Sequence, residues 1–251
     1  MAQRTHQAAA LILTALLVTS CAPLDKTISA EVITTPTAGV GETPLPPGVT
    51  VKGAVNNGRG TYLQTSIAED NPAMRFTASR ADEATNAKYS PESLDKAQKL
   101  VVRFIAEEGI DSTINGGGDP EAWWTVHEGI FHPAVKNSIH ADLLAGKDVV
   151  QRELWQQKYK GAYDYVYGSG LTRIKARSIR PFSVSLAKDA GVDAVRFSVD
   201  VTCATLVTPK VGKTGSGTQY TVGPMVYDVA QDAAGEWKII GYNNGTKTTE
   251  G

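Results

Sequence analysis

The chain has 251 residues, of which 41% are hydrophobic and 20% charged, enough apolar side chain to build a folded core. Its formal net charge is −1 at pH 7, which does not provide the strongly basic surface that binding to a phosphate backbone needs. We therefore expect no nucleic-acid partner.

The N-terminus has the pattern of an exported leader. Arg4 precedes an apolar run over residues 8–18, and the sequence LLVTSC then ends at Cys21. A run of this kind has the length of a signal-peptide core, roughly 7–15 residues. It is too short to cross a bilayer, which takes about 20 apolar residues.

The sequence LLVTSC resembles the bacterial lipobox, in which the chain is cut before the cysteine and the thiol is diacylated. The resemblance implies a signal peptide at 1–20 and lipidation at Cys21. It places the protein outside the cytoplasm, on the outer face of the bacterial cell membrane. The alternative is an ordinary signal peptide with a cysteine near its cleavage site. A lipidated Cys21 leaves Cys203 without an intramolecular disulfide partner, and we expect Cys203 to be buried.

Residues 21–60 are rich in Pro, Thr, Gly and Ala and show no apolar periodicity. This composition predicts a flexible, lipidated tether between the membrane and the folded part. Residues 61–89 are predicted to be irregular and to dock on the domain, with one short helix after Ser79, because Asn71 and Pro72 break any long element.

Three helices are predicted next. Ser90 and Pro91 have the pattern of a helix start, and apolar residues then recur at helical spacing up to a stop at Gly109. A second helix begins at Asp119 and Pro120, and a third covers about 134–145. Residues 148–160 have no clear pattern.

The final third changes period. Residues 194–207 alternate between apolar and polar side chains, which predicts a half-buried strand with Cys203 on its apolar face. A long strand over 171–186, bent at Pro181, is expected before it. Residues 220–229 and 236–242 are expected to form a hairpin after it.

Helices followed by long antiparallel strands predict an α+β fold, with N-terminal helices packed on a curved antiparallel sheet. The order of elements over 90–245 resembles the NTF2-like superfamily, which includes the SnoaL-like proteins. The resemblance is carried by the first amphipathic helix, by the helix with Trp123 and Trp124, and by the ending VYDV and WKIIGY. It implies a cone that encloses a pocket, used by enzymes, binders and dimerisation modules alike. Residues 246–251 are expected to be a disordered tail.

No catalytic or metal-binding motif is complete. In HEGIFH the two histidines, His127 and His132, are five residues apart, whereas a zinc site of this type needs a spacing of four. The glycines at 116–118 lack the Gly-Lys-Ser/Thr ending of a phosphate-binding loop. We expect no metal and no cofactor.

Aromatic side chains give the candidate ligand pocket: Trp124, His127, Tyr163 and Tyr165. Tyr163 and Tyr165 alternate and would share a strand face, where packing competes with ligand stacking as an explanation. The adjacent residues Trp123 and Trp124 cannot both point inward from one helix face. The alternating basic residues Arg173, Lys175 and Arg177 predict a solvated face, or a surface for an acidic partner.

The favoured function is therefore non-catalytic binding of a small ligand or a cell-envelope protein by the membrane-anchored domain. One alternative is a cyclase, isomerase or dehydratase of SnoaL-like type, for which His127, Asp164 and Asp200 are the titratable candidates. The other alternative is a structural module that forms a homodimer through its sheet face.

Overall fold

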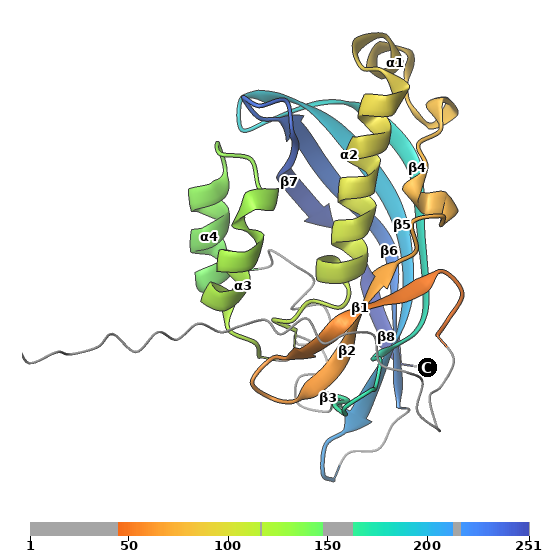
Figure 1. Ribbon diagram of the computed structural model, residues 1–251, viewed down its shortest axis with the longest axis vertical. Coiled ribbons are helices and arrows are strands. Elements are labelled where there is room, and N and C mark those ends of the chain that lie inside the picture. Colours follow the sequence, from red (N-terminus) through yellow and green to blue (C-terminus); the bar gives the residue numbers. More distant parts are fainter. Residues whose placement is uncertain (1–44, 116, 148–162, 213–216, 251) are drawn as a thin grey trace, which may run out of the picture. The chain divides into compact units, whose positions relative to one another are not determined.

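The computed structural model describes residues 45–115, 117–147, 163–212 and 217–250. These residues form an α+β domain in which helices pack against a strongly curled antiparallel sheet, as the sequence predicted (Figure 1). The predicted tether before residue 45, the segment 148–160 and the lipidation position Cys21 lie outside the described residues.

The curled sheet contains six strands within the described residues, and every pairing is antiparallel. They are β3 (Tyr163–Tyr165), β4 (Ile174–Asp189), β5 (Val192–Pro209), β6 (Thr218–Gln231), β7 (Trp237–Asn244) and β8 (Lys247–Glu250). The two long central strands, β5 and β6, pair with each other. β5 also carries β4 and β3, whereas β6 also carries β7 and β8.

The predicted alternation in β5 is confirmed. Val195, Phe197 and Val199 are buried in the main core, while Arg196 and Ser198 point to the opposite face. We call that opposite face the outer face of the sheet. Cys203 is buried, as expected. Where the bend was predicted, the β4–β5 register shifts between Pro181 and Ser183, which marks an irregularity in the pairing at this proline.

The longest helix, α2 (Pro91–Phe104), lies across the sheet and supplies its apolar face to the core (Figure 1). Its predicted start is confirmed, since the Ser90 hydroxyl accepts a hydrogen bond from the backbone N–H of Ser93 at 3.2 Å. The helix continues as a π-helical turn, Ile105–Gly109. The short helix expected after Ser79 is α1 (Glu83–Lys88).

The second and third predicted helices are α3 (Pro120–His127) and α4 (Lys136–Leu144), joined through a 3₁₀ turn at Glu128–Ile130. The Asp119 carboxylate caps α3 by accepting from the backbone N–H of Glu121 at 2.9 Å. None of the described helices has both the length and the apolar character needed to cross a bilayer.

Two expectations about the ends of the domain are wrong. The segment 49–60, expected to be part of the tether, forms β1 (Val49–Asn56) and the turn into β2 (Thr61–Ile67), so 61–89 is not wholly irregular either. Most β1 side chains are exposed or half-buried, so the strand has little apolar pattern to recognise. The expected disordered tail contains β8, which pairs with β6 over Gln219–Val222.

Candidate functional site

The π-helical turn after α2 places a carboxylate in the interior. Glu108 lies in this turn and its side chain is only 3% exposed. Turns of this kind are often found at functional sites. Because a buried carboxylate without partners is strongly unfavourable, its surroundings show what the site can do.

Glu108 accepts contacts from five side chains, a group that we call the Glu108 cluster. On Oε2 these are Trp123 Nε1 at 2.7 Å and Ser112 Oγ at 3.1 Å; on Oε1 they are Lys52 Nζ at 3.1 Å, His127 Nε2 at 3.1 Å and Gln64 Nε2 at 3.2 Å. Burial by itself would raise the pKa of Glu108, but the contacts with His127, Lys52 and Trp123 lower it to about 2. Glu108 is therefore an anion in the folded domain at neutral pH.

His127 is the predicted candidate that the fold does place beside a carboxylate. Its Nε2 faces Glu108, and its Nδ1 lies 2.8 Å from the carbonyl oxygen of Trp123. The ring also stacks on the Trp123 indole, with centroids 4.5 Å apart. A general acid or base needs a nitrogen that can reach the substrate. Both nitrogens of His127 face internal acceptors, so this geometry favours a cross-link within the core.

A second buried charge pair begins three residues after Glu108, at Asp111. Asp111 and Arg173 have side chains that are each 1% exposed, and their atoms Oδ1 and Nη2 are 2.9 Å apart. Asp111 also accepts from the backbone N–H and the hydroxyl of Thr65, at 2.8 and 2.9 Å. The Arg173 guanidinium lies 3.5 Å from the centre of the Tyr62 ring and 4.8 Å from that of Tyr165.

The two clusters join the β1–β2 hairpin to the rest of the domain. Lys52 from β1 bridges Glu107 and Glu108, and Thr65 from β2 bonds Asp111. From β4, the Arg177 guanidinium donates to the carbonyl oxygen of Ala106 at 2.9 Å and also bonds the Ser66 carbonyl oxygen. The buried polar groups therefore hold the hairpin against the π-helical turn and the start of β4.

The prediction of a solvated basic face on β4 is wrong for two of its three residues. Arg173 is buried against Asp111, and Arg177 is half-buried against backbone carbonyl oxygens, whereas Lys175 is exposed. The acidic partner of this row is in part an internal one. Arg173 and Arg177 are buried or half-buried because the β1–β2 hairpin, which the sequence analysis did not predict, covers this end of β4.

The expectation for the tryptophan pair is also wrong, because both side chains are buried. Trp123 is 2% and Trp124 is 7% exposed. Trp124 lies between two rings, stacked on Phe131 at 5.5 Å and on His140 of α4 at 4.7 Å. Helix α4 thus covers the second side of α3, so neighbouring positions on α3 can both be enclosed.

The four predicted pocket residues lie in two separate regions. Trp124 belongs to the main apolar core, and His127 stacks beside it on Trp123. Tyr163 and Tyr165 share a buried face of β3, as predicted, but pack in a smaller cluster with Val207. Their role in binding a ligand stays a prediction.

The other titratable candidates lie in partly exposed ion pairs. Asp164 is 3.5 Å from Arg59 and 3.7 Å from Lys210, and Asp200 is 2.8 Å from Arg180. Of the metal candidates, His132 accepts from the backbone N–H of Ala134. No group of three metal-ligating side chains is found in the ranges that the structure describes.

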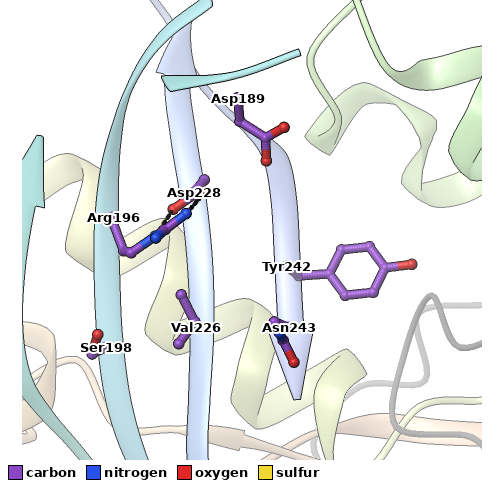
Figure 2. Close-up of a pocket in the computed structure, with 7 residues that line it drawn as sticks. All are labelled: Asp189, Arg196, Ser198, Val226, Asp228, Tyr242 and Asn243. Atoms are coloured by element: carbon purple, nitrogen blue, oxygen red, sulfur yellow. Dashed lines mark hydrogen bonds and ion pairs between the residues drawn. The ribbon is translucent and has the colours of Figure 1, made fainter. Parts of the chain in front are cut away.

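An open pocket of about 440 Å³ lies on the outer face of the sheet. Its lining comes from the β4–β5 turn, the middle of β5 and β6, and β7: Asp189, Arg196, Ser198, Val226, Asp228 and Asn243, with an edge from Tyr242. Figure 2 shows Arg196 paired with Asp228, while the Tyr242 ring points away from them. Sequence reasoning missed this pocket, because its residues come from four strands whose register it did not predict.

Sequence reasoning also missed Glu108, although one signal was present. Val101, Ile105 and Glu108 follow the i, i+4, i+7 spacing of the apolar helix face, so the carboxylate continues a buried stripe. An acidic residue on such a face must find internal donors, and this pattern could have identified it.

Comparisons of the chain with protein-family models, with curated proteins and with solved structures found no match.

Proposed function

We propose that this protein is a lipid-anchored domain of the bacterial envelope that binds a small ligand or an envelope partner without catalysing a reaction. Support for the anchor comes from the sequence LLVTSC, in which Cys21 is the lipidated residue. Two or more acyl chains hold a protein stably on a membrane, so no spanning helix is needed.

The observation that carries the binding role is the contrast between the interior and the outer face. Inside, the carboxylate of Glu108 and both nitrogens of His127 already have internal partners. On the outer face, the open pocket exposes charged and polar groups from several strands. Groups that are accessible and not fully paired can recognise a ligand, whereas a saturated buried cluster favours stability.

We also propose that the domain is a distant NTF2-like cone. The order of helices α2, α3 and α4 before the long antiparallel strands supports this assignment, as does the position of α2 across the curled sheet (Figure 1). The β1–β2 hairpin is an addition to the elements over 90–245 on which the resemblance was based. The assignment implies no activity, because one fold carries many functions.

The anchor is tested by expressing the full chain in a bacterial host and separating membranes from soluble proteins. The wild-type protein should be found in the membrane fraction, with a mature N-terminus at a lipid-modified Cys21 by intact-mass measurement. Cys21→Ser should move the protein to the soluble fraction or leave the leader uncleaved. Cys203→Ser is the matched control and should stay on the membrane. An unmodified thiol at Cys21 in the wild-type protein would overturn the proposal.

A further inference from the structure

The charged side chains in the outer-face pocket differ in how many of their polar atoms are already used in a pair. Arg196 donates to Asp228 through two atoms, Nε to Oδ1 at 2.8 Å and Nη2 to Oδ2 at 2.7 Å. This two-point pair uses both oxygens of Asp228, whose side chain is 5% exposed. Arg196 itself is 48% exposed and keeps Nη1 outside the pair. The pocket therefore retains the N–H groups of Arg196 Nη1, which can meet an anion.

The second carboxylate in the pocket, Asp189, interacts with Arg196 only through its charge, whereas Arg196 is hydrogen-bonded to Asp228. It is held in the pocket by two local features. The turn after it has positive φ at Ala190 (45°) and Gly191 (78°), the arrangement of a tight two-residue hairpin. Its Oδ2 lies where a side chain on Gly241 would begin, since a Cβ there would be 1.8 Å away.

Of these features, the positive φ of Ala190 is unfavourable for a residue with a side chain. A non-glycine residue with positive φ is strained, and such strain concentrates at functional sites. The β6–β7 register also shifts beside Gly241, between Asp228 and Val229. A strained turn, an irregular strand and a glycine that leaves room for a carboxylate thus meet around Asp189.

We infer that the outer-face pocket binds a small zwitterion, an α-amino acid with an aliphatic side chain. Its ammonium would meet Asp189, its carboxylate would meet Arg196 Nη1 and the Ser198 hydroxyl, and its side chain would lie on Val226. A volume of about 440 Å³ accommodates a molecule of this size. The inference rests on the proposed binding role but is independent of the lipid anchor.

The alternatives fit the same groups less well. A simple amine would leave Nη1 of Arg196 unused, and a simple acid would lie near the negative charge of Asp189. Only a ligand with both charges meets both groups. Each charge-assisted hydrogen bond contributes roughly a tenfold to hundredfold gain in affinity.

The test is isothermal titration calorimetry on the purified full-length protein with three probes that share one carbon skeleton. These are L-leucine, isopentylamine (leucine without its carboxylate) and 4-methylpentanoate (leucine without its ammonium). Leucine should bind at least tenfold more tightly than either of the others. Equal binding of the amine or of the acid would overturn the inference, as would the absence of binding by all three at millimolar concentration.

Two variants locate the site. Asp189→Asn keeps the shape and removes the charge, and should weaken leucine binding about tenfold to a hundredfold. Gly241→Ala should do the same by displacing the Asp189 carboxylate. Asp193→Asn is the matched control, because it removes one charge from the other strand of the same hairpin, where Asp193 pairs with Lys88. Unchanged leucine affinity in Asp189→Asn would refute the assignment, whereas loss of membrane attachment in Cys21→Ser reports only on the anchor.

Discussion

Replacing Arg173 with Met should strongly destabilise the domain. The change keeps an unbranched apolar side chain over the Tyr62 ring but removes both hydrogen bonds to Asp111 Oδ1, from Nε at 3.2 Å and from Nη2 at 2.9 Å. Asp111, whose side chain is 1% exposed, would then be buried with only Thr65 as its donor. Breaking a buried pair from one side costs about 3–5 kcal/mol in unfolding free energy.

Urea denaturation followed by tryptophan fluorescence measures this cost. The matched control is Arg180→Met, which breaks the exposed pair with Asp200 and should cost about 0–1 kcal/mol. The double variant Asp111→Asn with Arg173→Met should lose less than the sum of the single variants, because the uncompensated charge is absent.

The effect should also depend on pH. In the wild-type protein burial already raises the pKa of Asp111, and Arg173 acts to lower it. Removing Arg173 therefore raises this pKa further, so the folded variant takes up a proton at a higher pH than the wild-type protein does. The deficit should therefore be largest near pH 7 and smaller near pH 5. A loss below about 1 kcal/mol at pH 7, equal to that of Arg180→Met, would refute the reasoning that the buried pair is essential to the hairpin contact.

Three further predictions concern single side chains. Glu108, with a pKa lowered from 4.5 to about 2, should contribute about 3 kcal/mol of stability above pH 4.5 that is lost as the pH falls towards 2. Glu108→Gln should flatten this part of the stability profile in urea titrations between pH 2 and 7, and an unchanged slope would contradict the assigned contacts. Ala190→Asn should raise the free energy of unfolding by about 1 kcal/mol and the melting temperature by about 2–4 °C, because Asn tolerates positive φ better than Ala does. A melting temperature below that of the wild-type protein would count against the turn geometry. Burial raises the pKa of Cys203 to about 11, so in the Cys21→Ser background iodoacetamide should label it only after denaturation, and rapid labelling of the folded protein would show an accessible thiol.

The sequence predicted the parts of the fold that follow local chemistry. Ser90 and Pro91 begin α2 because the serine caps it and the proline suits a first turn. The alternation around Phe197 predicts β5, since a strand with one buried face must repeat every two residues. The hairpin predicted from residues 220–229 and 236–242 is found as the pair β6–β7, because the residue types between these two segments favour a tight reversal.

The parts that could not be predicted depend on contacts between distant segments. Nothing local to Arg173 indicates that Asp111, 62 residues away, will lie against it. The burial of Trp124 depends on α4, which has its own separate sequence signal. The pocket around Asp189 depends on a turn conformation and on the missing side chain of Gly241, neither of which has an apolar pattern.

If the proposed lipid anchor at Cys21 ties the chain to a membrane, the position of the β1–β2 hairpin has a mechanical consequence. Tension from such a tie would first reach Gly48, whose carbonyl oxygen accepts from the backbone N–H of Ala68 at 3.3 Å, and then the ladder that begins with Val49 opposite Ile67. Further along β1, Lys52 is held by Glu107 and Glu108 at 2.7 and 3.1 Å. A pull at this end would thus be borne first by hydrogen bonds and ion pairs of the hairpin, which contributes no residue to the outer-face pocket.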